Sequence, residues 1–365
     1  MPNTIFHDLL DLAVQSDASD LHIKTGAPTV FRVGNSLVDT SFTADAAAMA
    51  RFCSEIATPE QLEVFRKTGD LDLSLLEENV GRFRVNIHRQ RGTTSINMRY
   101  VKNTIRTFEE LGLPASIAKI AEMPRGIVFF TGTTGSGKST SMAAVLEYIN
   151  QRERKHVITI EDPIEYEFTD NLCLFEQREV GIDTDSFESA LIHSLRQDPD
   201  IIMVGEMRDK TSFEAALQAA DTGHLVITTL HATNAYQSVN RILDLYEKEE
   251  QDAIREALSL NLAAIISQRL VSKAMGNGRV PACEIMINNG VISKLIADNK
   301  LDKLPGAIAG SVNDGMCTFN QCLLGLVNDG VITEEDALIE SDNPEALKMN
   351  FEGIFLSSGN GGLGD

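Results

Sequence analysis

Hydrophobic residues in the first hundred positions recur with two spacings, one helical and one alternating. Helical spacing, with apolar residues on one face, predicts helices over residues 5–13, 44–56 and 59–68. Alternating or short apolar runs predict strands over residues 21–23, 30–33, 71–75, 82–88 and 94–100. The first hundred residues are therefore expected to form one small α+β domain.

A different pattern begins at Gly126, where apolar strands alternate with helical segments. The predicted strands cover residues 127–130, 156–160, 201–204 and 225–230, and each of them ends in polar residues. A helix is expected over residues 141–150, where apolar side chains fall on one face. Such alternation is typical of a parallel sheet covered on both faces by helices, so the fold class expected for this part is α/β.

The same pattern divides the chain into parts. These are an N-terminal domain (1–100), a connector (101–125), an α/β core (126–272), a helical C-terminal region (273–350) and a flexible tail (351–365). Short helices are expected in the connector over residues 109–113 and 117–123. Residues 252–272, and much of the chain as far as about 350, have helical spacing. The glycine-rich end of the chain is expected to be mobile.

Composition and charge narrow the class of protein. A chain of 365 residues with 43% hydrophobic residues is long enough for two globular domains. No apolar run approaches the roughly 20 residues of a membrane-spanning helix, and the first residues lack the features of a signal peptide. Five cysteines without C-x-x-C pairs favour a reduced, cytoplasmic setting over a disulfide framework or a zinc site. A formal net charge of −21 argues against a nucleic-acid motor, which needs a basic face.

The stretch from Gly132 to Ser139, GTTGSGKS, fits the phosphate-loop pattern G-x-x-x-x-G-K-[ST] at every fixed position. Its glycines allow backbone N–H groups to point at a phosphate chain, and the N-terminus of the following helix adds partial positive charge. Lys138 is expected to reach the β- and γ-phosphates, and the Ser139 hydroxyl to ligate Mg²⁺. The candidate nucleotide-binding residues are Thr133, Thr134, Gly135, Ser136, Gly137, Lys138, Ser139 and Thr140.

Two of the predicted strands end in acidic residues. The strand over 201–204 leads to Glu206, which is the Walker B arrangement, where a carboxylate supports Mg²⁺ directly or through water. The strand over 156–160 leads to Glu161, Asp162 and Glu165. Like charges so close together are most easily explained if they face a cation or a water to be activated, with a solvated acidic loop as the alternative.

Two histidines flank the strand over 225–230, His224 before it and His231 after it. Either could contact a γ-phosphate across the sheet, and a structural histidine is the alternative. Arg84 and Arg99 lie on predicted strands of the N-terminal domain, and a guanidinium group suits phosphate oxygens. In a ring of subunits these arginines could act on a neighbour's γ-phosphate, although their spacing alone favours surface salt bridges.

Four stretches together resemble the Walker A, Asp box, Walker B and His box of secretion ATPases. They cover residues 131–140, 160–166, 198–209 and 222–232. More narrowly, they resemble the PilT/PilU retraction ATPases of type IV pili, and residues 18–23 match the start of that family's N-terminal domain. The resemblance covers nearly all of residues 1–350. The four-cysteine metal insertion of assembly ATPases is absent from the sequence, which favours the retraction branch.

The resemblance implies a PAS-like N-terminal α+β domain, a RecA-like P-loop ATPase domain and a homohexameric ring that hydrolyses Mg-ATP at subunit boundaries. It implies that Glu165 polarises the attacking water and that Glu206 is the Walker B glutamate. Normal hydrolysis after loss of the Glu165 carboxylate would move the base to Glu161. The residues implied in catalysis are Glu165, Glu206, His231, His224, Arg84 and Arg99.

The function implied is an ATP-driven motor for pilus retraction and twitching motility, cytoplasmic and peripheral at the inner membrane. The implied partners are further copies of the chain, an inner-membrane pilus platform protein and a paralogous retraction ATPase, without nucleic acid. Residues 288–297 lack the Ala-Ile-Arg run of PilT, and residues 258–271 and 335–344 look more like PilU, so a PilU-like role is favoured. The alternatives are an accessory nucleotide-binding subunit of another motor, an assembly or secretion ATPase, and a nucleic-acid motor.

Overall fold

The computed structural model describes residues 4–34, 36–101, 104–276 and 278–354. The chain divides into two compact units, Met1–Thr104 with Glu165–Glu167, and Ile105–Ile164 with Phe168–Asp365. The glycine-rich tail expected over 351–365 lies outside the described residues from position 355 onward. Among the helices of the described ranges, none is both long and apolar enough to cross a membrane.

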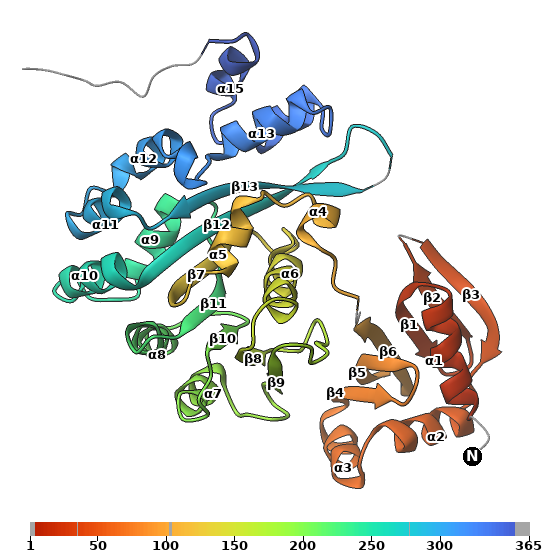
Figure 1. Ribbon diagram of the computed structural model, residues 1–365. Helices are drawn as coiled ribbons and strands as arrows, with labels where there is room; N and C mark the ends of the chain where they lie inside the picture. Colours follow the sequence, from red (N-terminus) through yellow and green to blue (C-terminus); the bar gives the residue numbers. More distant parts are fainter. Residues whose placement is uncertain (1–3, 35, 102–103, 277, 355–365) are drawn as a thin grey trace, which may run out of the picture. The chain divides into compact units, whose positions relative to one another are not determined.

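The N-terminal unit is built on a six-stranded antiparallel sheet (Figure 1). Its strands, in the spatial order β3-β2-β1-β6-β5-β4, are β1 (Ala18–Lys24), β2 (Pro28–Val33), β3 (Ser36–Thr43), β4 (Asp70–Glu77), β5 (Gly81–Gln90) and β6 (Thr93–Val101). Its helices are α1 (Ile5–Gln15), α2 (Ala46–Ile56) and α3 (Pro59–Thr68). The predicted α+β domain is confirmed, with β3 as an additional strand whose side chains are mostly exposed.

Alternation along the strands separates the core of this unit from its polar face. On β5, Phe83, Val85 and Ile87 are buried, whereas the side chains between them are only partly covered. The buried set packs with Phe6 and Phe52 of the helices in one hydrophobic core. The outward face of β5 and β6 is therefore left to polar and charged side chains.

The second unit centres on a seven-stranded sheet in the order β13-β12-β7-β11-β10-β8-β9. Its strands are β7 (Gly126–Thr131), β8 (His156–Glu161), β9 (Leu174–Glu179), β10 (Ile201–Val204), β11 (Leu225–Leu230), β12 (Leu262–Ser272) and β13 (Arg279–Ile287). Neighbouring strands from β12 to β9 are parallel, and only β13 runs antiparallel to its neighbour. The central strands β7, β10 and β11 are buried along their whole length because helices cover both faces.

The helices of this unit surround the sheet and extend beyond it. They are α4 (Phe108–Leu111), α5 (Ser116–Ala121), α6 (Lys138–Asn150), α7 (Phe187–Ser194), α8 (Lys210–Asp221), α9 (Ala235–Leu243), α10 (Gln251–Asn261), α11 (Gly290–Ala297), α12 (Leu304–Gly310), α13 (Phe319–Asn328), α14 (Glu334–Glu340) and α15 (Pro344–Phe351). In Figure 1, α6 lies on one face of the sheet, and α7 and α8 lie on the other. This is the RecA-like arrangement expected from the sequence.

The helix expected over residues 252–272 is wrong beyond Asn261, because Leu262 to Ser272 form β12. The first residues of β12 are all buried, since the strand lies between β7 and β13 and helices cover it. A strand buried on both faces shows no alternation, so an apolar run of this kind cannot be distinguished from a buried helix by spacing. The boundary expected at residue 272 falls inside the β12–β13 hairpin, and helical structure follows only from Gly290.

Candidate nucleotide-binding site

The loop from Gly132 to Gly137 connects β7 to α6 at the carboxyl edge of the parallel sheet. Gly132, Gly135 and Gly137 have φ angles of +145°, +80° and +89°, which favour glycine. A Cβ atom at Gly132 would lie 2.5 Å from the backbone oxygen of Gln268, and one at Gly137 would lie 2.8 Å from Gln268 Nε2. At Gly135 no atom lies within 4 Å. The two glycines fixed by the motif are therefore required by space as well as by backbone angle.

Lys138 is buried, and its ammonium group is held by the loop itself. Nζ donates to the backbone oxygens of Gly132 at 2.9 Å and Thr133 at 3.0 Å. A buried ammonium needs such partners because it has lost its hydration. Residues Thr133, Thr134 and Gly135 form the exposed part of the loop, whereas Ser136 is buried. Within the described residues, Ser136 Oγ has no hydrogen-bond partner.

Glu206 follows β10 and forms a charged cluster at the same edge of the sheet. Arg208 Nη2 lies 2.6 Å from Glu206 Oε2, and His231 Nε2 lies 3.2 Å from Glu206 Oε1. The hydrogen bond from Arg208 lowers the pKa of Glu206 in spite of partial burial, and the charges of Arg208, His231 and Lys138 add to this effect. Glu206 is therefore a carboxylate at neutral pH, as a Mg²⁺-supporting residue must be.

The strand register brings Glu206 and His231 to the edge that carries the loop. Leu230, the last residue of β11, pairs with Thr131, the last residue of β7 before the loop. Thr229 Oγ1 donates to the backbone oxygen of Gly205 at 2.7 Å and fixes the segment that leads to Glu206. Residues predicted from separate motifs thus meet through the pairing of β10, β11 and β7.

His224 lies at the other edge of the sheet. It precedes β11, and its backbone oxygen accepts from Gly126 N, at the start of β7. The six residues of β11 separate it from His231 by roughly 20 Å at the usual strand rise. Its Nδ1 contacts the backbone oxygen of Ala219 at 2.8 Å. The structure does not bring His224 to the phosphate loop of its own chain.

Two acidic residues of the Asp box have different surroundings. Glu161 ends β8 and is buried, accepting from Thr159 Oγ1 at 2.7 Å and from Gln177 Nε2 at 3.2 Å. It lies beside the strand of Glu206, because Gly205 N donates to the oxygen of Ile160, the residue before Glu161. Glu165 is exposed and groups with the N-terminal unit.

Arg84 and Arg99 are direct cross-strand partners on β5 and β6 of the N-terminal unit. Arg99 Nε donates to Asp20 Oδ1 at 2.8 Å, and Arg99 is largely exposed. Burial raises the pKa of Asp20, but hydrogen bonds from Ser19 and Arg99 outweigh it and leave this pKa below its usual value. The two arginines thus lie side by side on the polar face of the sheet, and Asp20 anchors Arg99 there.

The residues of the site fit Mg²⁺ bound together with a nucleotide. Ser139 supplies a half-buried hydroxyl at the start of α6, and Glu206 supplies an ionised carboxylate. Across the described ranges, no group of three or more histidine, cysteine or acidic side chains could hold a metal by itself. Mg²⁺ commonly binds through one or two protein groups with phosphate oxygens and water, so this donor set is suitable.

Two further residues near the site were missed by the sequence reasoning. Gln268 contacts the loop through its side chain, and the helix expected over 252–272 concealed it because it was not recognised as part of a strand beside β7. Arg208, two residues after Glu206, was quoted within a motif but given no role, although it is the main partner of the carboxylate. A basic residue directly after the acidic strand end was the available signal.

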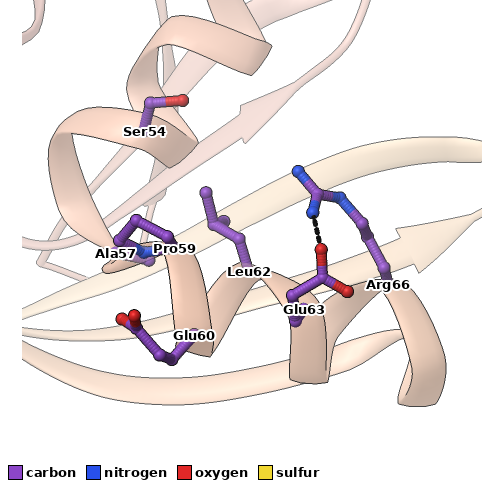
Figure 2. Close-up of a pocket in the computed structure, with 7 residues that line it drawn as sticks. All are labelled: Ser54, Ala57, Pro59, Glu60, Leu62, Glu63 and Arg66. Carbon is purple, nitrogen blue, oxygen red and sulfur yellow. Dashed lines mark hydrogen bonds and ion pairs between the residues drawn. The ribbon is translucent and has the colours of Figure 1, made fainter.

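Cavities lie in both units. One of about 220 Å³ borders the loop, with Thr233, Arg269 and Arg279 among its lining residues. Another of about 420 Å³ lies between α2 and α3 of the N-terminal unit, where Leu62 faces the hollow and Glu63 pairs with Arg66 at its rim (Figure 2). Of these two cavities, only the one beside the loop is lined by residues of the candidate nucleotide site.

Comparisons with known proteins agree with this site. A family model described as Type II/IV secretion system protein matches residues 2–308. The type IV pilus retraction ATPase PilT of Pseudomonas aeruginosa is 40% identical over 339 residues, covering 93% of this chain and 98% of that protein. The type IV pilus ATPase PilU of the same organism is 38% identical over 345 residues, covering 94% and 90%. These identities do not distinguish a PilT-like from a PilU-like chain.

Solved structures extend the agreement to the fold. A crystal structure of the pilus retraction motor PilT with bound ADP superimposes with a TM-score of 0.87 at 38% identity, covering 95% of this chain and 99% of that one. The Legionella pneumophila ATPase DotB follows with a TM-score of 0.78 at 26% identity, covering 96% of both chains. The chain therefore belongs to the Type II/IV secretion system protein family, and within it to the group of type IV pilus ATPases.

Proposed function

We propose that this protein hydrolyses ATP as a subunit of a homohexameric ring that powers retraction of a type IV pilus. The observation that carries the proposal is the phosphate loop with buried Lys138 on the same sheet edge as the ionised Glu206 and His231. The relatives named for pilus retraction and the ADP-bound retraction motor support it.

In this proposal the loop binds and the acidic residues prepare the reaction. Backbone N–H groups of the loop and the Lys138 ammonium hold the β- and γ-phosphates. Ser139 and Glu206 would hold Mg²⁺, which would neutralise charge on the phosphates. Glu165 polarises the attacking water. His231, whose Nε2 lies 3.2 Å from Glu206 Oε1, is placed to respond to the γ-phosphate. His224 has no part in the site of its own chain.

The remaining residues of the proposed site come from a neighbouring subunit of the hexameric ring. Arg84 and Arg99 belong to the N-terminal unit, and in the proposed hexamer they reach the γ-phosphate of a neighbouring subunit. The proposed location is the cytoplasmic side of the inner membrane, against a pilus platform protein, with a paralogous retraction ATPase as a second partner. No nucleic acid is proposed, since the net charge of −21 opposes binding to phosphate backbones.

A second candidate is an accessory subunit that binds nucleotide and supports another motor, because one relative is named a type IV pilus ATPase without mention of retraction. The two roles are separated in cells. In a strain of the source organism that lacks this protein, a retraction motor is expected to be missing, so twitching motility is lost. The wild-type chain should restore it, and Glu206→Gln, which is expected to bind ATP without hydrolysing it, should not. Restoration by Glu206→Gln would instead favour the accessory role.

A further inference from the structure

We propose that Gln268 is a positioning residue of the ATPase site, which holds the phosphate loop in the shape that receives a nucleotide. The inference rests on the proposed function, since it assumes that the loop binds phosphate. Gln268 itself has no contact with the reacting atoms in this proposal. It acts through the backbone of the loop.

The position of β12 brings Gln268 to the loop. β12 runs parallel to β7, and its Ser267 pairs with Thr131, the last residue of β7. The two hydroxyl groups are joined, because Thr131 Oγ1 donates to Ser267 Oγ at 2.8 Å. The next residue of β12 therefore lies beside the loop at the point where it leaves the sheet.

The side chain of Gln268 connects the loop to the helix that follows it. It is 2% exposed, its Nε2 donates to the backbone oxygen of Ser136 at 2.8 Å, and its Oε1 accepts from Ser141 Oγ at 2.8 Å. Since a backbone oxygen can only accept, Nε2 must face Ser136, and Oε1 then faces the hydroxyl of Ser141. Both halves of the buried amide are used, as buried polar groups require.

Gly132 and Gly137 of the loop both lie against Gln268. Added Cβ atoms at Gly132 and Gly137 would lie 2.5 Å and 2.8 Å from the backbone oxygen and the Nε2 of Gln268. At Gly132 the space for a side chain is taken by the β12 backbone and by Ser136 Oγ at 2.6 Å, and only at Gly137 is it taken by the Gln268 side chain. Gln268 and the two glycines together set the path of the loop.

The bond to Ser136 also sets the direction of a phosphate-binding donor. In a trans peptide the C=O and the following N–H point in opposite directions. With the oxygen of Ser136 turned toward Gln268, the N–H of Gly137 points away from β12. This is the orientation that a loop needs if its N–H groups are to converge on an anion. Loss of the glutamine donor would free that peptide to rotate.

The test replaces only the hydrogen-bond donor of Gln268, its side-chain Nε2. Gln268→Glu keeps an acceptor for Ser141 but places a carboxylate oxygen against the oxygen of Ser136, which repels it. We expect the dissociation constant for ADP, measured by calorimetry on the full chain with Mg²⁺, to rise at least about tenfold, the effect of losing a buried hydrogen bond. Ser141→Ala removes the other anchor and should raise it by a smaller factor.

Asn150→Asp is the matched control, because it makes the same chemical change at the far end of α6. Asn150 is 1% exposed, and its Nδ2 donates to the backbone oxygen of Thr169 at 2.9 Å. We expect this variant to lose thermal stability but to bind ADP like the wild type. If Gln268 only stabilised the fold, Gln268→Glu and Asn150→Asp should bind ADP with the same affinity whenever their melting temperatures are the same.

The outcomes separate the inference from the function on which it rests. If the wild type binds ADP and Gln268→Glu binds it equally well, the positioning role is overturned and the proposed function stands. If Asn150→Asp weakens binding as much as Gln268→Glu, the positioning role is likewise overturned. If the wild type binds no ADP, both are overturned. If Gln268→Glu fails to fold, Ser141→Ala decides, and unchanged affinity in that variant counts against the proposal.

Discussion

Lys138, Glu206 and His231 lie at one edge of the sheet because parallel strands end at a common edge. Glu206 and His231 follow their strands within two residues, and Lys138 follows β7 after the six residues of the loop. His224 shows the limit of this reasoning. It was paired with His231 although a six-residue strand lies between them, and strand geometry alone separates the two ends.

The proposed roles of the acidic residues are tested by replacing one carboxylate at a time with an amide. Glu206→Gln and Glu165→Gln keep the shape of the side chain but remove the charge that supports metal or orients water. We expect ATP binding to be retained and hydrolysis to fall on the order of a hundredfold or more, the scale of a lost general base. Binding is followed by calorimetry and hydrolysis by phosphate release.

Glu161→Gln is the comparison variant that identifies which carboxylate acts as the base. It is buried beside the strand of Glu206, whereas Glu165 is exposed. Normal hydrolysis by Glu165→Gln together with a large loss in Glu161→Gln would move the base to Glu161. Normal hydrolysis in all three variants would contradict the assignment of these acidic residues to the site.

At the scale of elements, the sequence predicted the parallel strands that flank the loop but not the β12–β13 hairpin that supports it. Leu262 to Ile266 are all buried, so their spacing carries no information about strand or helix. Gln268 was missed for the same reason, since its role depends on the pairing of β12 with β7. Pairing between strands that are far apart in the sequence leaves no signal in the local spacing of hydrophobic residues.

Glu284 of β13 leads to a prediction about how the stability of the fold depends on pH. Its carboxylate is buried and accepts from Ala235 N, the first residue of α9. Its pKa is raised from 4.5 to about 7, mainly because the side chain is buried; the hydrogen bond from Ala235 and the charge of Arg269 lower the pKa in part, and the charge of Asp342 raises it. The folded state therefore keeps this proton at pH values where the unfolded chain has released it.

The contribution of Glu284 to folding should then fall as pH rises from about 4.5 through 7 and level off above that. Glu284→Gln keeps an acceptor for Ala235 without titrating. We expect the stability of the wild type relative to this variant to decrease by up to about 3 kcal/mol between pH 4.5 and 8, measured by urea unfolding. A difference that does not change over this interval would contradict the assignment.

At the scale of the whole molecule, the two-domain organisation followed from the change of pattern near Gly126, and the fold class is confirmed by the agreement with the PilT structure. The arrangement of subunits is a property that a single chain does not contain. Arg99 illustrates this, because its contact with Asp20 within the N-terminal unit is visible in one chain, whereas the catalytic role proposed for Arg84 and Arg99 needs a neighbouring subunit.

Mixing two inactive variants tests whether the site is shared between subunits. Arg99→Ala should bind ATP without hydrolysing it, since an arginine supplied in trans can be worth about a thousandfold or more in rate. Mixed with Lys138→Ala, it should regain part of the activity, because some interfaces then join an intact loop to an intact arginine. No recovery at any mixing ratio, with mixed rings shown by mass measurement to have formed, would count against a shared site.

The most direct measurement is ATP turnover by the purified full chain, with Lys138→Ala as the comparison. The account predicts Mg²⁺-dependent phosphate release by the wild type and background release by Lys138→Ala, since the loss of the ammonium removes the charge that holds the β- and γ-phosphates. Circular dichroism should show the same fold in both proteins. Hydrolysis by Lys138→Ala at close to the wild-type rate would contradict the assignment of the Gly132–Ser139 loop as the nucleotide site.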